Sequence, residues 1–214
     1  MKRVSILSIF LLFYISSYAQ KPCPGVPTVK YAGKTYHTVQ IGSRCWLKKN
    51  LDVGTRINVT VEQTNNGTIE KYCYEDDPAN CMTYGGLYQW NEAMQYVTTP
   101  GSQGICPKGW HIPTEAEFQT LATTVSNDGN ALKAVGQGTE SGIGTNTSGF
   151  SSLLAGYRIN CPLFGHLGYV TNFWSSTEDN ATYAHYMDLF YNVSSVSVDS
   201  LDKEFGFSVR CVKD

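Results

Sequence analysis

The seven cysteines of this chain limit its fold more than any other feature of the sequence. They are Cys23, Cys45, Cys73, Cys81, Cys106, Cys161 and Cys211. A zinc site is disfavoured, because no C-x2-C pair occurs and the four histidines are scattered. In an exported chain, such a set of cysteines predicts a disulfide framework. Because their number is odd, at least one thiol must be free or pair with another molecule.

The N-terminus predicts that the chain is exported. Lys2 and Arg3 precede an apolar run over residues 4–15, and the triplet S-Y-A that ends at Ala19 has the form of a cleavage site. We therefore expect a signal peptide over residues 1–19. The run is short for a membrane span and no later window is as apolar, so no membrane insertion is expected after cleavage. The expected location is secreted, periplasmic or at the cell surface.

The charge of the chain argues against nucleic acid as a partner. The formal net charge is −2, and no block of Lys and Arg occurs. Charged residues make up only 16% of the chain, whereas it contains 14 tyrosines and 20 glycines. This composition is typical of secreted, loop-rich and β-rich binding proteins, and it favours that class.

Periodic patterns predict the order of the elements. A strand is expected over residues 35–41, and a hairpin over residues 57–74 around the turn signal Asn66-Gly67. Helical spacing of apolar residues predicts a helix over residues 87–97. Further strands are expected over residues 150–158, 172–178, 183–191, 194–200 and 205–212. In the last of these, period-two alternation places Phe205, Phe207, Val209 and Cys211 on one face.

The segment CPKGWHIPTEAEFQTL, residues 106–121, predicts the start of a second helix. Thr114 and Glu117 form a T-x-x-E capping box. Beyond it, apolar residues recur at the spacing of a helix that packs on a core: Phe118, Leu121, Ala122 and Val125. Acidic side chains in a first helical turn also interact favourably with the helix dipole. A structural role for Glu115 and Glu117 is therefore favoured over a catalytic carboxylate pair.

Six ordered blocks of the chain resemble a known family. They are TVQIGSRCWLKKNL, YCYEDDPANCMTYGGLYQWNEAM, GICPKGWHIPTEAEFQTL, SGFSSLLAGYR, FWSSTE and FGFSVRCVKD. In this order they resemble the Fibrobacter succinogenes major paralogous domain family, whose members are exported by Bacteroidota and Fibrobacterota. The resemblance covers residues 36–214, which we expect to form one domain behind an N-terminal extension over residues 20–35.

The resemblance implies an α+β fold of the C-type-lectin-like type. In this fold two helices pack on small twisted antiparallel sheets, and disulfides staple the body. The resemblance implies a bridge between Cys106 and Cys211, which closes a loop of about a hundred residues. The spacing of Cys73 and Cys81 suits a short local loop, and Cys23 and Cys45 remain for a third bridge. Cys161 is then the free or intermolecular thiol.

Two clusters are weighed as sites of chemistry. Cys106 and His111 have the residue types of a nucleophile and its base. Because Cys106 is expected to be in a disulfide, a structural role is favoured for both residues. No catalytic residue is expected. Glu75, Asp76 and Asp77 offer oxygen ligands for calcium, although Asp-Asp-Pro is also ordinary turn chemistry. No other cofactor is expected. The calcium-ligating triplets of sugar-binding lectins (E-P-N, Q-P-D and W-N-D) are absent, and the copper-binding cysteines of formylglycine-generating enzymes have no counterpart.

The segment over residues 160–172 is the expected ligand site. In C-type-lectin-like folds the long loop at this position carries the ligand, and here it contains Phe164, His166 and Tyr169, with Arg158 at its start. Aromatic rings stack on sugars or anchor protein interfaces. An ordinary tyrosine-rich loop explains these residues equally well. The four tryptophans are expected in the core instead: Trp46, Trp90, Trp110 and Trp174.

Three hypotheses for function follow. The leading one is a non-catalytic binding or adhesion module that recognises a glycan or a protein at the cell envelope through residues 160–172. The second is an envelope enzyme related to formylglycine-generating and sulfatase-modifying domains, which requires two reduced cysteines near each other in a cleft. The third is a structural subunit of a surface assembly that is cross-linked through Cys161.

Overall fold

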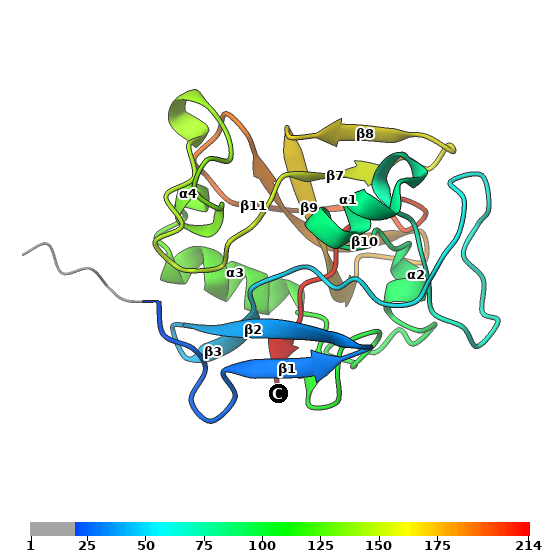
Figure 1. Ribbon diagram of the computed structural model, residues 1–214, viewed down its shortest axis with the longest axis horizontal. Helices are drawn as coiled ribbons and strands as arrows, with labels where there is room; N and C mark the ends of the chain where they lie inside the picture. Colours follow the sequence, from blue (N-terminus) through cyan, green and yellow to red (C-terminus); the bar gives the residue numbers. More distant parts are fainter. Residues whose placement is uncertain (1–19) are drawn as a thin grey trace, which may run out of the picture.

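Two sheets of five strands each carry the fold in this computed structural model, which describes residues 20–214 (Figure 1). The expected signal peptide, residues 1–19, lies outside the described residues. Short helices and long connections fill the space around the two sheets. The fold is therefore of the α+β class, as expected.

The first sheet joins the two ends of the described chain. Its strands, in spatial order, are β1 (Thr28–Tyr31), β2 (Lys34–Ile41), β3 (Arg44–Leu47), β12 (Val212–Lys213) and β6 (Trp110–His111), and every pairing is antiparallel. The strand predicted over residues 35–41 is confirmed as the main part of β2. Residues 20–35 were expected as an extension, and they contribute β1 to this sheet.

The second sheet contains the later strands. In spatial order they are β11 (Ser197–Asp202), β10 (Tyr183–Phe190), β9 (Val170–Glu178), β7 (Ala155–Arg158) and β8 (Phe164–Leu167). All pairings are antiparallel except that of β7 with β9. The segment over residues 160–172 is therefore not one long loop. It contains the edge strand β8, and Gly168 at φ 80° allows the tight turn into β9.

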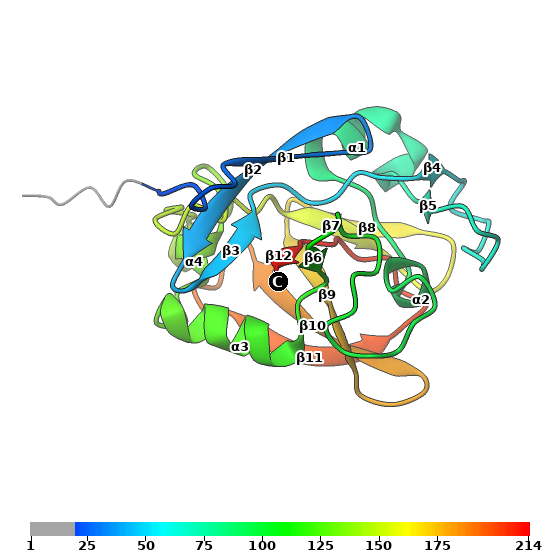
Figure 2. The ribbon, with the colours of Figure 1, turned by 90° about the horizontal axis from the view of Figure 1, so that it is seen from below.

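The longest helix begins where the sequence predicts it. The hydroxyl of Thr114 accepts the backbone N–H of Glu117, and the Glu117 carboxylate accepts the backbone N–H of Thr114, so the predicted capping box starts α3 (Glu115–Thr124). Phe118 and Leu121 bury the apolar stripe of α3 against β9 and β10. Figure 2 shows α3 alongside the second sheet.

The helix expected over residues 87–97 is only the single turn α2 (Trp90–Ala93). The chain leaves the helical conformation at Gln95 and Tyr96, whose φ values are 52° and 60°. There the hydroxyl of Tyr96 donates to the buried carboxylate of Glu92 at 2.8 Å. The same carboxylate accepts the backbone N–H of Glu70 at 2.9 Å, so a tertiary contact holds the residue at which the predicted helix stops. The other helical segments are η1 (Tyr74–Asp76), α1 (Pro78–Tyr84), α4 (Gly129–Leu132) and η2 (Glu140–Gly142).

The hairpin expected over residues 57–74 is also wrong. The short strands β4 (Thr55–Arg56) and β5 (Glu70–Lys71) pair in parallel, and the chain between them is irregular. Asn66 and Gly67 still form a local turn, since the Asn66 side chain accepts the N–H of Thr68 at 2.9 Å. The turn signal is therefore real, but the flanking segments bond to other parts of the chain. One such bond runs from the backbone N–H of Gln63 to the Gln89 side chain at 3.1 Å.

The core forms around the C-terminal segment. Phe207, Val209 and Cys211 are fully buried in one apolar cluster, and Phe205 packs against that cluster. The predicted apolar face of residues 205–211 is therefore confirmed, but the strand expected over residues 205–212 is not: only β12 is regular, and Ser208 and Arg210 are buried as well. All four tryptophans are also buried, as expected: Trp46, Trp90, Trp110 and Trp174.

Three disulfides staple this body. They join Cys23 to Cys45, Cys73 to Cys81, and Cys106 to Cys211, which are the expected pairs, and Cys161 is a free and exposed thiol. Such bonds are typical of proteins outside the cytoplasm. Among residues 20–214, no helix combines the length and the hydropathy that crossing a bilayer requires.

Candidate functional site

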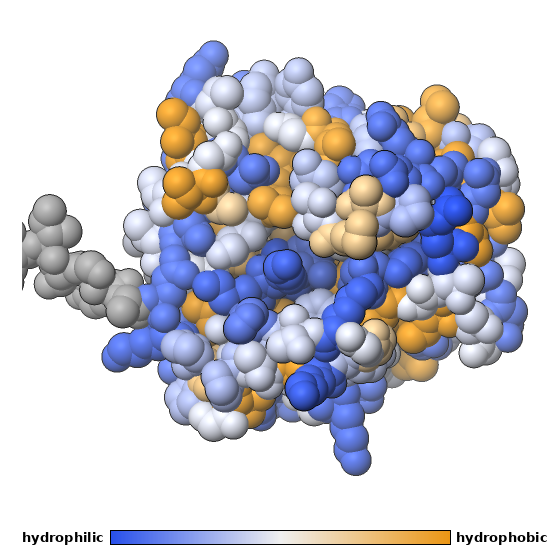
Figure 3. Space-filling view, in the orientation of Figure 1, coloured by the Kyte–Doolittle hydropathy of each residue, from blue (hydrophilic) through white to orange (hydrophobic). Residues whose placement is uncertain are grey.

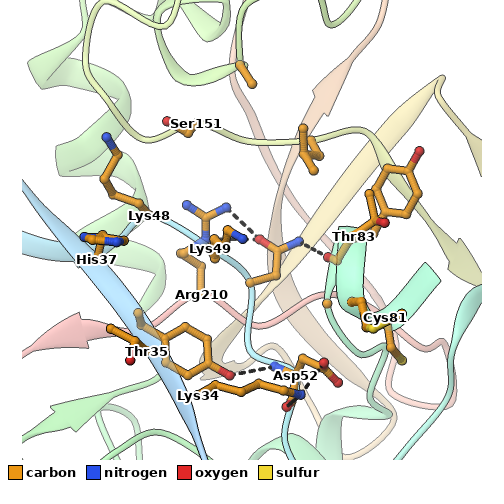
Figure 4. A pocket seen from close by; sticks show the side chains of 17 residues that line it. Lys34, Thr35, His37, Lys48, Lys49, Asp52, Cys81, Thr83, Ser151 and Arg210 are labelled. Atoms are coloured by element: carbon orange, nitrogen blue, oxygen red, sulfur yellow. Dashed lines mark hydrogen bonds and ion pairs between the residues drawn. The ribbon is translucent and has the colours of Figure 1, made fainter. Parts of the chain in front are cut away.

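A cleft of about 600 Å³ opens between the first sheet and α1. One wall comes from residues 34–37 of β2 and the chain that follows β3, and the opposite wall comes from residues 81–85 at the end of α1. Residues 151–153 close the upper side (Figure 4). In the orientation of Figure 1, hydrophilic side chains gather along the middle of this face (Figure 3). The cleft thus brings together residues from distant parts of the chain.

Most charged groups that line the cleft are cationic. They are Lys34, Lys48, Lys49 and Arg210, with the exposed imidazole of His37 beside them (Figure 4). The lining contains one carboxylate, that of Asp52, and it forms ion pairs with both Lys34 and Lys71. Asp52 is therefore already neutralised by two ammonium groups. The Asp52 carboxylate does not balance the positive charges of Lys48, Lys49 and Arg210.

Arg210 is the buried part of the lining, with 1% of its surface exposed. Its Nε and Nη2 donate to the side-chain oxygen of Asn50 at 3.1 and 2.6 Å, and its Nη1 donates to the carbonyls of Leu47 and Phe150. Its guanidinium also lies 4.3 Å from the centre of the Phe150 ring, a cation–π contact. Burial lowers the pKa of Arg210 to about 9, so the group still carries its charge at neutral pH. All of these partners are neutral.

Local contacts hold α1 in place as the wall of the cleft that faces β2. Asp77 caps the N-terminus of α1 through the N–H of Ala79 at 2.9 Å, and the disulfide between Cys73 and Cys81 ties the helix to the preceding turn. Gly85 follows the helix at φ 89°, and a Cβ there would lie 2.6 Å from the Cβ of Asn50. A glycine is therefore required where this wall meets the residue that holds Arg210.

The residues expected to bind a ligand lie outside the cleft. Arg158 has no exposed surface, and its Nη2 forms an ion pair with Glu62 at 2.5 Å. Phe164 packs on the ring of Tyr74 at 5.2 Å. His166 and Tyr169 are exposed; His166 stacks on the ring of Tyr157, and Tyr169 makes an edge-to-face contact with Tyr191. His166 and Tyr169 are thus accessible from solvent, whereas Arg158 is buried and does not line the cleft.

The acidic turn expected to hold calcium makes local hydrogen bonds instead. The carboxylate of Asp76 accepts from the backbone N–H of Val59 and from the Asn58 side chain, each at 3.0 Å. Asp77 caps α1, and Glu75 is exposed. Within residues 20–214, no three side chains of His, Cys, Asp or Glu are grouped so that they could hold a metal ion. Calcium binding by this turn stays a prediction that the geometry does not support.

The pair considered as nucleophile and base is part of the scaffold. Cys106 is fully buried and bonded to Cys211. The two ring nitrogens of His111 bond to carboxylates instead, Nδ1 to Asp214 at 2.6 Å and Nε2 to Glu117 at 2.9 Å. Neither group has the contacts that thiol catalysis requires.

The sequence carries no local signal of the cationic cleft. Its charges come from β2, from the chain after β3, and from the C-terminal segment, so no local run of Lys and Arg exists to signal it. Arg210 gave no signal either, because it stands with Ser208 on the polar face of the alternation over residues 205–211, where an exposed arginine is expected.

Comparison with known proteins supports the family but supplies no close relative. The family model described as Fibrobacter succinogenes major domain matches residues 39–213. Neither a curated protein nor a solved structure matches the chain. The family match covers the whole second sheet, the first sheet except β1 and the start of β2, the cleft except residues 34–37, and the disulfide between Cys106 and Cys211. The chain therefore belongs to the Fibrobacter succinogenes major domain family.

Proposed function

We propose that this protein is an exported, non-catalytic binding or adhesion module on a C-type-lectin-like scaffold, and that it binds a glycan or a protein at the cell envelope. The observation that carries the proposal is the cleft between β2 and α1, with a buried guanidinium among its lining groups. Ligand sites of this size are concave and combine apolar walls with a few fixed polar groups. The three disulfides support a location outside the cytoplasm.

The state of the cysteines favours a binding module over an envelope enzyme. An enzyme of the formylglycine-generating kind requires two reduced cysteines close together. Six of the seven cysteines are bonded in pairs, and the remaining thiol, Cys161, is exposed near the edge strand β8. Titration of the unreduced protein with a thiol reagent should therefore find one reactive thiol, and three or more would favour the enzyme.

A structural subunit of a surface assembly is the second candidate. The observation that favours it is the exposed thiol of Cys161, which is accessible to a second molecule. Non-reducing gels of the protein from its own envelope would show a cross-linked species that disappears in a Cys161→Ser variant. Monomer alone would count against this function.

The binding function is tested with a glycan array and with pull-downs from envelope extracts. The variant Thr83→Trp adds bulk to the α1 wall without a change of charge, and it should abolish every interaction that uses the cleft. The double variant His166→Ala and Tyr169→Ala tests the exposed part of residues 160–172. If the double variant loses binding and Thr83→Trp keeps it, the binding site is the face around β8, as the sequence predicts.

A further inference from the structure

The distribution of charge in the cleft bears on the class of its ligand. Four cationic side chains line the cleft, and the carboxylate of Asp52 is the single anionic one. That carboxylate already faces the ammonium groups of Lys34 and Lys71. The whole chain has a formal net charge of −2, so the positive excess in the cleft is a local property that folding creates. A cleft lined by charges of one sign concentrates ligands of the other sign.

The bonding of Arg210 is incomplete in a way that suits an anion. A guanidinium has five N–H groups, and those of Arg210 make four hydrogen bonds, to the Asn50 side chain and to the carbonyls of Leu47 and Phe150. One hydrogen on Nη2 has no acceptor among residues 20–214. Buried charges are normally paired with a charge of opposite sign, and within the described chain this one meets neutral partners only. An anion in the cleft would supply the countercharge that Arg210 lacks within the described chain.

Two lysines extend this positive region to the rim. Lys49 is exposed, and Lys48 is half-buried and donates to the side-chain oxygen of Gln20 at 3.0 Å. Neither lysine has a carboxylate within ion-pair distance in the described part of the chain. Figure 4 shows both of them on the same side of the cleft as Arg210. An anionic ligand at the rim would therefore meet two lysines, with the buried guanidinium of Arg210 in the wall behind them.

We infer that the cleft binds a carboxylate-bearing glycan, whose acid groups meet Lys48 and Lys49 beside the buried positive charge of Arg210. This inference rests on the proposed function. Hydroxyl side chains also line the cleft, those of Thr35, Thr83 and Ser151. Acidic sugars carry hydroxyl groups beside each carboxylate and so match both kinds of lining group, whereas an acidic peptide offers carboxylates without the ring hydroxyls.

The test compares probes that differ in charge or in backbone. Calorimetric titration of the whole mature protein would use an oligogalacturonate, its methyl ester, and poly-glutamate. The oligogalacturonate should bind, and both the ester and poly-glutamate should bind at least about tenfold more weakly. Raising NaCl from about 50 mM to about 500 mM should weaken the binding of the acid form, because salt screens exposed charges.

Matched variants locate the interaction. The double variant Lys48→Ala and Lys49→Ala should raise the Kd for oligogalacturonate about tenfold. The control is Lys30→Ala with Lys108→Ala, which removes the same charge from exposed positions outside the cleft and should leave the Kd unchanged. An equal effect of the two double variants would show that net charge alone drives binding and would overturn the inference.

Failure of the inference can be told apart from failure of the proposed function. If the ester and the acid bind equally and Thr83→Trp abolishes both, the cleft is a glycan site but its ligand class is wrong. If poly-glutamate binds more tightly than the oligogalacturonate, the ligand is an acidic peptide and the glycan assignment is wrong. If no acidic probe binds the wild-type protein at low salt, the inference fails, and the array and pull-down results decide on the proposed function.

Discussion

Two arginines, Arg158 and Arg210, are buried, and they differ in how their charge is balanced. Arg158 lies 4.6 Å from the centre of the Tyr72 ring and forms an ion pair with Glu62, whose side chain is 56% exposed. Arg210 has amide, carbonyl and aromatic partners without a carboxylate. Each guanidinium makes four hydrogen bonds through its five N–H groups, so the two differ only in charge: Arg158 has a carboxylate partner within the chain and Arg210 has none. This difference leads us to place the ligand at Arg210.

Removal of Arg158 should affect stability. The Arg158→Ala variant leaves the carbonyls of Val59 and Glu204 without their donor, and it should lower the free energy of unfolding by about 2 kcal/mol. The exposed Tyr169→Ala is the comparison and should change it by less than about 0.5 kcal/mol. Urea denaturation measures both values. Equal effects would contradict the buried role of Arg158.

The ion pairs of His111 should make stability depend on pH. Burial alone would lower the pKa of His111, but its bonds to Glu117 and Asp214 outweigh burial and raise it. Burial likewise opposes ionisation of Glu117, yet its hydrogen bonds from His111 and Thr114 lower its pKa to about 2. Glu117 is thus ionised across the range in which His111 titrates. The stabilisation from His111 is full below its unfolded pKa of about 6.5 and is lost as the pH rises through the higher folded value.

The measurement is urea denaturation at about pH 5.5 and about pH 8.5. Substitution His111→Gln should cost about 1 kcal/mol more at the lower pH, because the imidazolium is present only there. In a Glu117→Gln background this pH-dependent part should shrink, since one of its two carboxylate partners is gone. A cost that is the same at both pH values in the wild-type background would contradict the role of His111.

At the scale of elements, the sequence predicts a helix start reliably where the interacting groups are only a few residues apart. The capping box of Thr114 and Glu117 involves neighbouring groups only, and α3 begins there. The helix expected over residues 87–97 is cut short where the Glu92 carboxylate bonds to the backbone of Glu70 and the chain turns left-handed at Gln95 and Tyr96. The hairpin around Asn66 fails because its flanking segments bond to other parts of the chain. Local periodicity could not detect either tertiary contact.

The junction of α1 with the cleft provides a prediction about a single glycine. Gly85→Ala places a Cβ 2.6 Å from the Cβ of Asn50 at a φ of 89°, so it combines a clash with backbone strain. Gly67→Ala is the matched control, because its φ is 78° and nothing lies within 4 Å of the added Cβ. Thermal or urea unfolding should show a loss of about 1 kcal/mol for Gly67→Ala and at least about 2 kcal/mol more for Gly85→Ala. Equal losses would show that the wall tolerates a side chain.

At the scale of the whole molecule, the disulfides should contribute according to the chain that they enclose. Cys106 and Cys211 are 105 positions apart, whereas Cys73 and Cys81 are 8 apart. In the chain-entropy model, replacing the long-range pair by alanines should cost about 4.7 kcal/mol, and replacing the short-range pair about 2.5 kcal/mol. Urea denaturation of the two double variants gives the comparison. A larger cost for the short-range pair would mean that local strain or packing around α1 outweighs loop entropy.

The sequence by itself determined the parts of this protein that rest on chemical type and short spacing. Seven cysteines and the family resemblance predicted the three disulfides, a capping box predicted the start of α3, and period-two alternation predicted the buried face of residues 205–211. Only the tertiary structure decided where the cleft lies and that Arg210 lines it. Lys34, Lys48 and Arg210 become neighbours because the first sheet pairs strands from opposite ends of the described chain. Charges so far apart in sequence leave no local pattern, and their common field exists only after the chain folds.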